Sequence, residues 1–505
     1  MSAPLGPQQP QTKVQRWRPV LPRMQGNVLM RTLLGLLVLA AVGAALAWWV
    51  VGAVGVPPRL LAPYIARRAA GHNPTIVAVG ERIAAIMLRN DRGPVRTPQP
   101  MSLRLGAQPA AAPREPTGTA PGASRVVPVA SAAALLAAID QARAGDVDTI
   151  APGTYRLHAS YIAAHGAGTA AAPITVRAAQ PGTVLLELDA VEGFLVSAPY
   201  WQFENLGISG VCADDSDCEH AFHVVGKASH FVARNNTVRN FNAHFKINAV
   251  GQNAPDAGIL EANTLTNDAI RRTANPVTLI DLVAASDWII RKNFLSDFFK
   301  GDGDQVSYGA YAKGGGSNNV FENNVVLCEY LLRSPHGARV GLSLGGGGTG
   351  AAFCRAGVCH GEQDHSLIRA NLIANCADVG IYLNRAADSR IIHNTLVDTG
   401  GIAVRYPEST AYLEGNLVDG AIHGRDGATL TKVDNIDTAT ARLYLGSHPM
   451  RQLLASPGNA FGGRVPRRTG VGTVVPDLCA TAAIAPTTEA TPAYGAFANF
   501  ANCMR

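Results

Sequence analysis

The amino-acid sequence predicts an all-β chain: a parallel β-helix that follows an N-terminal transmembrane helix. Three observations lead to this prediction. An asparagine recurs between short β-branched runs, glycine is abundant (52 residues) while aromatic residues make up only 6%, and one long uncharged stretch lies near the N-terminus. A chain of 505 residues is long for one compact domain, so we expect an elongated fold or several parts.

The N-terminal region predicts a membrane anchor. Residues 1–31 contain five basic residues and no acidic one, and residues 32–56 contain no charged residue. An α-helix needs about 20 apolar residues to cross the hydrocarbon of a bilayer, whereas a cleaved signal peptide has an apolar stretch of about 7–15 residues. We therefore expect a basic cytoplasmic leader over 1–31 and an uncleaved single span over 32–56.

Cysteine usage agrees with this orientation. All eight cysteines follow residue 200, and Cys212 with Cys218 and Cys354 with Cys359 form two pairs that are close in sequence. An even number of cysteines beyond a membrane predicts disulfides in an oxidising compartment, and the spacings do not match a zinc site. The predicted location is a bacterial-type inner membrane, with the N-terminus cytoplasmic and the β-helix periplasmic or extracellular. The net charge of +6 is spread along the chain, so no nucleic-acid partner is expected.

Three segments connect the anchor to the repeats. Residues 57–92 predict a juxtamembrane helical segment in which Asn73 caps a helix that starts at Pro74. Residues 93–125 are rich in proline without hydrophobic periodicity, which predicts an extended linker. Residues 131–144 predict a cap helix at the start of a β-helix that covers 127–500.

The recurring asparagines define the repeat. They are Asn236, Asn263, Asn293, Asn324, Asn371, Asn394 and Asn416, with spacings of 27, 30, 31, 47, 23 and 22 residues. Self-similarity at 20–50 residues indicates a repeat architecture, and short alternating apolar runs between turn residues indicate strands. We interpret the asparagines as one corner of successive coils, where the residue adopts the left-handed conformation and stacked amides bond to each other.

Several stretches resemble the pectin-lyase-like right-handed parallel β-helix superfamily, over roughly residues 127–500. GDVDTIAPGTYRL resembles its N-terminal cap and first coil, AAAPITVRAAQPGTVLLEL its second coil in the alginate- and chondroitin-lyase branch, and PDLC…PAYGAFANF its closing segment. AKGGGSNNVFENNVV is similar to uncharacterised membrane-anchored relatives of that branch. The resemblance implies a long face that binds an extended polysaccharide through residues on neighbouring coils.

The strands before the asparagine corners offer candidate substrate contacts. The residues are Lys227, Asp281, Lys313, Asn384, Arg385 and Arg405. A mixed row of this kind suits an anionic, uronate-containing polysaccharide; the alternative is that these are solvated charges at the sheet edge.

The resemblance also suggests a reaction. In the alginate- and chondroitin-lyase branch, a lysine that follows a strand and precedes a turn rich in Ser, Gly and Asn removes the proton next to the substrate carboxylate. Lys313 in AYAKGGGSNN occupies that place. Arg333 and Arg339 are the candidates to pair the carboxylate, because the strand VGLSLGGGG carries no arginine where the branch has one.

The resemblance implies Ca²⁺ as a cofactor, but QVSYGAYAK has no acidic residue where the branch carries its calcium ligands. No metal-ligand spacing was found in the sequence, and Asp214, Asp215 and Asp217 are interpreted as a solvated acidic loop. The expected function is a membrane-anchored β-helix that binds an anionic polysaccharide and cleaves it by β-elimination. The alternative is a non-catalytic protein that binds envelope glycans or a partner through the same face.

Overall fold

A computed structural model describes residues 25–93, 104–108, 125–346, 349–454, 473, 475–479, 494–497 and 503. The predicted leader therefore lies largely outside the described residues, as does most of the predicted linker. The chain divides into two units, residues 1–54 and 55–505. The first unit contains the 30-residue helix α1 (Gln25–Val54). Among the residues that the structure describes, no helix combines the length and the apolar character needed to cross a membrane.

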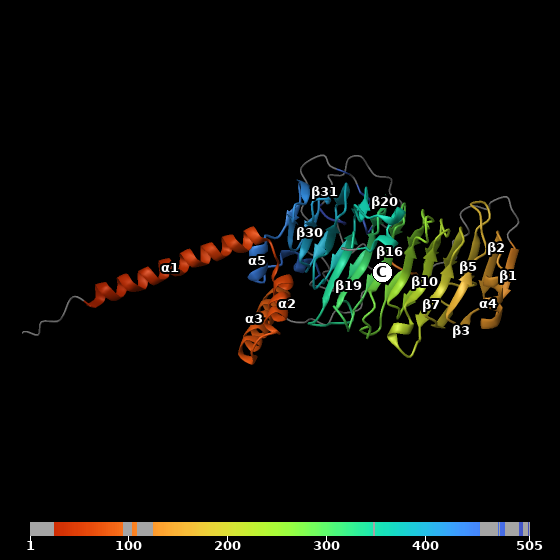
Figure 1. Ribbon diagram of the computed structural model, residues 1–505, viewed down its shortest axis with the longest axis horizontal. Coiled ribbons are helices and arrows are strands. Elements are labelled where there is room, and N and C mark those ends of the chain that lie inside the picture. Colours follow the sequence, from red (N-terminus) through yellow and green to blue (C-terminus); the bar gives the residue numbers. More distant parts are fainter. Residues whose placement is uncertain are drawn as a thin grey trace, which may run out of the picture. The chain divides into compact units, whose positions relative to one another are not determined.

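The second unit contains a solenoid of three parallel sheets, and each full coil adds one strand to each sheet (Figure 1). We name the sheets I, II and III in the order in which a coil visits them. The sheets consist of short runs rich in Val, Ile, Leu and Phe in which buried and less buried positions alternate, as in β6, because side chains of a strand point to opposite faces. The prediction of an all-β parallel β-helix is confirmed.

Sheet I has 12 strands and sheet II has 11. The strands of sheet I are β1 (Arg125–Val129), β2 (Asp146–Ile150), β5 (Ile174–Ala178), β8 (Trp201–Glu204), β11 (Val232–Arg234), β14 (Ile259–Glu261), β17 (Ile289–Arg291), β21 (Val320–Glu322), β25 (Leu367–Arg369), β28 (Ser389–Ile392), β31 (Thr410–Glu414) and β34 (Thr429–Val433). Those of sheet II are β3 (Gly153–His158), β6 (Val184–Asp189), β9 (Gly207–Gly210), β12 (Thr237–Arg239), β15 (Thr264–Thr266), β18 (Phe294–Ser296), β22 (Val325–Leu327), β26 (Leu372–Ala374), β29 (Thr395–Val397), β32 (Leu417–Val418) and β35 (Ile436–Asp437).

Sheet III has 10 strands and includes the longest ones. They are β4 (Tyr161–Ala164), β7 (Glu192–Val196), β10 (His220–Val225), β13 (Ala243–Asn248), β16 (Val277–Val283), β19 (Val306–Lys313), β23 (Ala338–Leu344), β27 (Ile381–Asn384), β30 (Gly401–Arg405) and β33 (Ala421–Arg425). A separate pair, β20 (Gly316–Ser317) with β24 (Gln363–Asp364), lies at the corner that leads from sheet III to sheet I.

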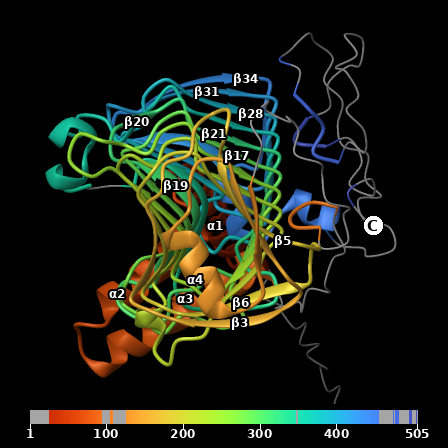
Figure 2. The same ribbon diagram turned by 90° about the vertical axis from the view of Figure 1, so that its right-hand side faces the viewer.

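The core runs through the interior of the coils. Phe194, Phe222 and Phe245 occupy the same register on β7, β10 and β13, and their ring centroids lie 5.2 and 4.9 Å apart. The N-terminal end of this core is closed by α4 (Ala132–Asp140), whose Leu135 and Ile139 are buried (Figure 2). Ser131 caps α4 by accepting from the Ala134 N–H at 3.1 Å, as the sequence predicted.

The corner between sheets I and II holds a column of asparagines. Each Nδ2 donates to the Oδ1 of the next asparagine at 2.8–3.1 Å, from Asn236 through Asn263, Asn293, Asn324, Asn371, Asn394 and Asn416 to Asn435. The amides from Asn236 to Asn416 are buried. The predicted ladder is therefore confirmed and extends to Asn435.

One detail of the asparagine prediction was wrong. The left-handed residue is the one before each ladder asparagine, for example Ala262 (φ 55°), Lys292 (φ 56°) and Ala370 (φ 52°). The ladder asparagine is needed for its amide, because its Oδ1 also accepts the backbone N–H of the preceding ladder residue, as between Asn293 and Asn324 at 3.0 Å.

A helical hairpin packs on the C-terminal end of the solenoid. It consists of α2 (Pro58–Ala69) and α3 (Pro74–Arg92), and Asn73 caps α3 as predicted. Arg59, 1% exposed, pairs with Asp91 at 2.7 Å and Asp398 at 2.8 Å and donates to the Cys376 carbonyl. Leu60 packs against the outer face of sheet III at Val340, Val379 and Ala403. Helix α5 (Thr440–Tyr444) and the short helix Pro449–Leu454 complete this end.

Four disulfides join all eight cysteines. Cys212–Cys218 and Cys354–Cys359 close two short loops, as expected from their proximity in sequence. Cys328–Cys376 connects successive coils, and Cys479–Cys503 lies in the closing segment. Short helical turns lie within these loops at Asp215–Asp217 and Arg355–Gly357, and a third, Ala351–Phe353, directly precedes Cys354.

Candidate functional site

The outer face of sheet III carries a cluster of ionisable side chains on three adjacent strands. Lys246 on β13, Asp281 on β16 and Tyr311 on β19 lie at one register position. The Lys246 Nζ lies 2.7 Å from Asp281 Oδ2. Two residues along β19, the Nζ of Lys313 lies 4.6 Å from the centre of the Tyr311 ring. Parallel strands lie about 4.8 Å apart, so this register brings together residues that are 35 and 30 positions apart in sequence.

Burial sets the protonation states of this cluster. Burial lowers the pKa of Lys313, and Lys246 adds to this effect while Asp281 opposes it. Burial alone would raise the pKa of Asp281, but the two lysines and the Tyr311 hydroxyl lower it overall. Burial and the Asp281 carboxylate raise the pKa of Tyr311 well above 10. The site thus holds an ionised carboxylate, a protonated phenol and a lysine that loses its proton more easily than usual.

Histidines continue the cluster towards the N-terminal coils. His223 on β10 is in register with Lys246, and its Nε2 lies 2.7 Å from Asn248 Oδ1. Its Nδ1 lies 3.2 Å from Glu192 Oε2. Burial lowers the pKa of the neighbouring His220 to about 3, so this imidazole is neutral at physiological pH. Burial and Glu192 raise the pKa of Glu219.

The insertion between β23 and β24 borders Lys313. A Cβ placed on Gly346 would lie 2.6 Å from the Lys313 Cδ, so a larger residue there would displace the lysine side chain. The buried Glu362 accepts the Gly314 N–H at 3.0 Å and the Thr349 N–H at 2.9 Å. These bonds fix the backbone next to Lys313.

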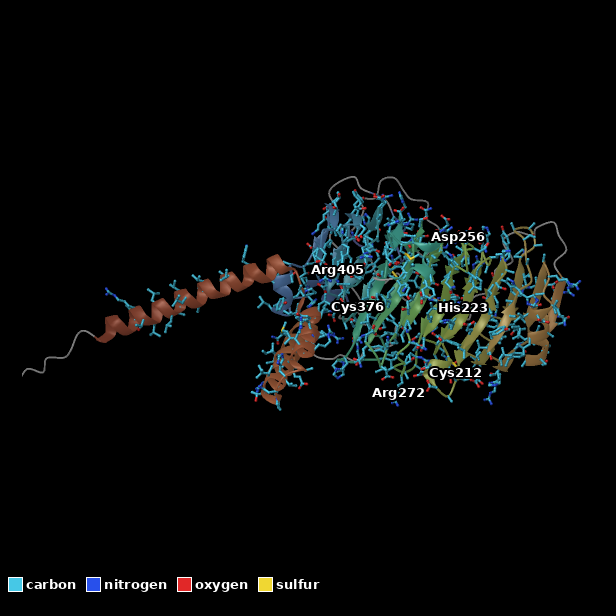
Figure 3. The ribbon with its side chains drawn as sticks, in the orientation of Figure 1. Cys212, His223, Asp256, Arg272, Cys376 and Arg405 are labelled. Atoms are coloured by element: carbon cyan, nitrogen blue, oxygen red, sulfur yellow. A yellow bond between two sulfur atoms is a disulfide. The ribbon has the colours of Figure 1, made fainter. Side chains whose placement is uncertain are left out.

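Two of the predicted substrate contacts align with Lys313. Register places Ala312, Leu344 and Leu383 side by side, so the next position holds Lys313, Gly345 and Asn384. Asn384 pairs in turn with Arg405. At about 4.8 Å per strand, Arg405 lies three strands and roughly 14 Å from Lys313 along the solenoid. Arg405 on β30 and His223 on β10, both labelled in Figure 3, have five strands of sheet III between them.

The structure does not bring Arg333 and Arg339 to Lys313, although the sequence interpretation grouped them as catalytic. Arg339 on β23 is in register with Ser307 on the adjacent strand β19. Ser307 precedes Lys313 by six residues, so Arg339 lies about 20 Å from Lys313 along the strand direction. It is 1% exposed, pairs with Glu329 at 2.7 Å and lies over the Phe299 ring. Arg333 pairs with the same Glu329 at 3.4 Å. Both arginines therefore compensate a buried carboxylate.

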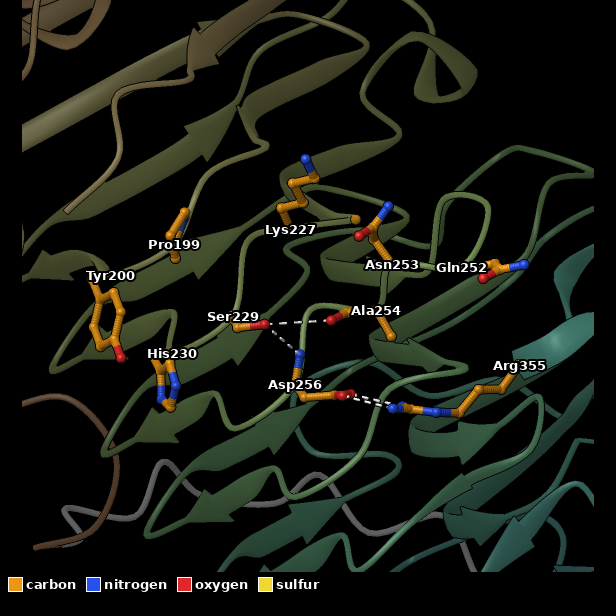
Figure 4. Close-up of a pocket in the computed structure, with 11 residues that line it drawn as sticks. Pro199, Tyr200, Lys227, Ser229, His230, Gln252, Asn253, Ala254, Asp256 and Arg355 are labelled. Carbon is orange, nitrogen blue, oxygen red and sulfur yellow. Dashed lines mark hydrogen bonds and ion pairs between the residues drawn. The ribbon is translucent and has the colours of Figure 1, made fainter. Parts of the chain in front are cut away.

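Lys227 and Arg385 lie at the corner that leads from sheet III to sheet I. Arg385 (φ 54°) pairs loosely with Glu408 at 3.8 Å and lies over the Tyr406 ring. Arg405, on the sheet itself, pairs with Asp426 and lies over the same ring. Lys227 lines a separate pocket at this corner (Figure 4). The predicted row is thus split between the sheet face and the corner.

Among the described residues, one group of side chains has a geometry that could hold a metal ion. Asp364, His365 and Asp388 offer ligand atoms within 4.8 Å of one another, and His365 Nδ1 lies 2.8 Å from Asp364 Oδ1. Calcium takes 6–8 oxygen ligands, and this set supplies two carboxylates and an imidazole. The group therefore fits calcium poorly.

The interpretation of the sequence missed Lys246, Tyr311 and His223. The only sequence signal for them is their distance from the following ladder asparagine, and that distance varies because the loops after sheet III differ in length. Lys246 precedes Asn263 by 17 residues, whereas Tyr311 precedes Asn324 by 13.

Comparisons with known proteins find similarity among solved structures alone. No family model matches the chain, and no curated protein matches it significantly. Among solved structures, pectate lyase Pel9A is 17% identical with a TM-score of 0.46, and the match covers 74% of this chain and 96% of that one. An alginate lyase from Paenibacillus sp. str. FPU-7 is 16% identical (TM-score 0.33; 58% and 98%). The A-module of the Azotobacter vinelandii mannuronan C-5 epimerase AlgE4 is 15% identical (TM-score 0.35; 61% and 92%).

The parallel β-helix that the resemblance implied is present in the three parallel sheets of the structure. At these identities and scores, the similar structures assign no activity to this chain.

Proposed function

We propose that the outer face of sheet III binds an anionic, uronate-containing polysaccharide and that Lys313 cleaves it by β-elimination. The observation that supports this most is the place of Lys313, a lysine of lowered pKa, two residues along β19 from the aligned row of Lys246, Asp281 and Tyr311. A base must be neutral to accept a proton, and general bases work best when their pKa lies near the operating pH.

In the proposed reaction, Lys313 first accepts a proton and then returns it. Its neutral Nζ takes the C5 proton next to the substrate carboxylate, the C4–O4 bond breaks, and a C4–C5 double bond forms. The resulting ammonium returns the proton to O4 of the leaving sugar, so the lysine ends neutral. Lys246 pairs the substrate carboxylate and favours the negative charge that develops there.

Asp281 and Tyr311 are positioning residues in this scheme. The Asp281 carboxylate holds Lys246 at 2.7 Å, and the Tyr311 ring lies under the Lys313 ammonium at 4.6 Å. A lysine head over an aromatic face is attracted by the ring quadrupole. The ring thus directs the flexible lysine stem.

A second candidate is a non-catalytic glycan-binding face. It is favoured by the position of Arg333 and Arg339, which leaves no arginine of that pair beside Lys313. In that case the same lysines bind the chain and no double bond forms.

The test is direct. The full chain is incubated with alginate, pectate and glycosaminoglycans, and the absorbance of the unsaturated uronate is followed. Lys313→Ala should lower the rate by about 100-fold or more. Lys292→Ala, which removes an exposed lysine at the other corner, is the matched control and should leave the rate unchanged. Binding of a polysaccharide without any absorbance change would favour the second candidate.

The proposal also concerns the cellular location of the chain. We infer that residues 32–56 anchor the chain in an inner membrane with the β-helix outside the cytoplasm. Support comes from the uncharged 25-residue run and from the four disulfides, which persist in oxidising compartments. Alkaline extraction of membranes should leave the chain in the pellet, and its release would contradict the anchor.

A further inference from the structure

A pocket opens at the corner that leads from sheet III to sheet I, away from the cluster on the sheet face. It has a volume of about 530 Å³ and is lined by turns of successive coils and by the disulfide-closed loop of the insertion (Figure 4). The residues that decide its chemistry are Tyr200, Lys227, His230, Asn253, Asp256 and Arg355. Of these, only Lys227 was a candidate from the sequence.

Tyr200 and His230 form an aromatic platform. Their rings lie 4.5 Å apart with an interplanar angle of 12°. The stack arises because both residues occupy the same corner position in successive coils with φ 61°: Tyr200 N–H donates to the Ser229 carbonyl and His230 N–H to the Asp256 carbonyl. The next residue of this column, Ala257 (φ 61°), carries no ring, so the stack ends at His230.

Arg355 and Asp256 form the polar wall opposite the platform. The Arg355 guanidinium donates to both Asp256 oxygens at 2.8 and 2.7 Å, and Asp256 also accepts the Ser286 N–H at 2.8 Å. Both side chains are partly exposed, at 38% and 28%, so lone pairs and N–H groups remain open to solvent. This pair joins residues 99 positions apart and fixes the loop of the insertion to the coil below.

Lys227 supplies an available positive charge. Its side chain is exposed, and among the residues that the structure describes it has no ion-pair or hydrogen-bond partner. Asn253, also exposed, offers an amide on the same side of the opening. The pocket thus combines the apolar ring surface of Tyr200 and His230, the paired donor and acceptor groups of Arg355 and Asp256, and the positive charge of Lys227.

A sugar ring has matching features. The C–H groups of a pyranose form an apolar face that packs on an aromatic ring, and its hydroxyls both donate and accept, as a carboxylate–guanidinium pair requires. Sites for small ligands combine such an apolar surface with a few placed polar groups. We infer that this corner pocket binds a single uronate residue of a glycan chain, with the ring on the Tyr200–His230 platform and the carboxylate at Lys227. The assignment of a uronate rests on the proposed function.

The corner pocket is attached to the strand that carries Lys313. The Arg355 N–H donates to the Gly314 carbonyl at 2.7 Å, directly after Lys313. Val225 on β10 is aligned with Lys313 on β19, three strands away in sheet III. Lys227 follows Val225 by two residues. At about 4.8 Å per strand, the two sites lie roughly 14 Å apart along the solenoid, so one oligosaccharide can reach both.

The experiment measures binding by calorimetry with a hexamer of guluronate and a hexamer of galacturonate, in a Lys313→Ala background that prevents cleavage. His230→Ala and Lys227→Ala should each weaken binding about 10-fold or more, and Ala254→Trp should block the pocket. His165→Ala removes an exposed histidine outside the pocket and should have no effect. Thermal unfolding of each variant checks that the fold is intact.

The outcomes separate this inference from the proposed function. Binding that is lost in Lys246→Ala but unchanged in the corner variants would overturn the corner pocket and leave the sheet III proposal standing. Loss in the corner variants alone would support the pocket and overturn the role of sheet III in binding. Equal affinity for a neutral glucose hexamer would overturn the assignment of Lys227 to a carboxylate.

Discussion

The corner between sheets I and II and the outer face of sheet III use the same coils in opposite ways. At the corner, the same amide recurs from Asn236 to Asn435 and satisfies the same backbone groups in each coil. On the face, eight aligned positions change from coil to coil: His223, Lys246, Asp281, Tyr311, Ser343, Tyr382, Ala403 and His423.

The difference separates what the fold needs from what a site needs. A solenoid must satisfy the buried polar groups of every coil, and one residue type does this most simply by repetition. A binding or catalytic site needs unlike groups next to each other, so its residues do not repeat. Repetition therefore marks structure in this chain, and its absence on an aligned face marks the candidate site.

The largest effect is expected in the middle of the asparagine column. Asn324→Ala removes the acceptor of the Asn293 N–H and Nδ2 and the donor to the Ile290 carbonyl, all in a buried place. Because each buried group left without a partner costs about 1–3 kcal/mol, the free energy of unfolding should fall by about 3–5 kcal/mol. Urea unfolding measures it, with Asn435→Ala at the partly exposed end of the column as the control. Equal losses at the two positions would contradict a ladder whose value depends on burial.

The next effect concerns Asp281, on the variable face. Asp281→Asn removes the carboxylate that favours the Lys313 ammonium, so the pKa of Lys313 falls further and the pH dependence of cleavage moves to lower pH. A profile that moves to higher pH would exclude Lys313 as the base.

Asp281 should also stabilise the fold in a pH-dependent manner. Its pKa is lowered in the folded chain, so its contribution is present above the unfolded pKa of about 3.9 and disappears as the pH falls through the folded value. Asp281→Asn should cost about 2–3 kcal/mol at pH 7, below the usual range for a fully buried pair because Lys246 is partly exposed. The cost should shrink below pH 4, which urea unfolding at several pH values checks.

A smaller, local effect is expected from the Cys354–Cys359 disulfide. The double variant with Cys354→Ser and Cys359→Ser opens a six-residue loop, which should lower the free energy of unfolding by about 2 kcal/mol. Most of this loss should be felt within the insertion. Amide exchange should accelerate at 349–362 and around Asp256, whereas the coils keep their protection. Faster exchange in sheets I and II would show that the insertion supports the whole solenoid.

The smallest effect is expected at Arg405. It is partly exposed and pairs with Asp426, so Arg405→Ala should change the free energy of unfolding by less than about 1 kcal/mol. A drop in polysaccharide affinity in this variant would extend the binding face to β30. Unchanged affinity would confine the face to the coils around Lys313.

The repeated part of the molecule could be predicted from the sequence. The asparagine spacing predicted the column, Ser131 and Asn73 predicted two helix starts, and the close cysteines predicted two of the four disulfides. Each of these features is local or recurs, so it is visible in a single sequence.

The cluster on sheet III was only partly predictable. Lys313 and Asp281 were found, but their neighbour Lys246 was not, because the alignment of strands depends on loops whose lengths differ from coil to coil. The pairing of Arg339 with Glu329, ten residues earlier, required the chain to fold back at a turn that the sequence does not mark. Register and turn geometry, which are tertiary properties, decide these contacts.

The helical hairpin has a consequence for how the chain folds. Arg59 finds its partners in Cys376 and Asp398, which are 317 and 339 residues later. During synthesis from the N-terminus, α2 and α3 emerge before the solenoid and cannot dock until nearly all of it has been made. The last coils are therefore completed by helices made before the first coil, and we expect docking of α2 and α3 to be a late step in the folding of this unit.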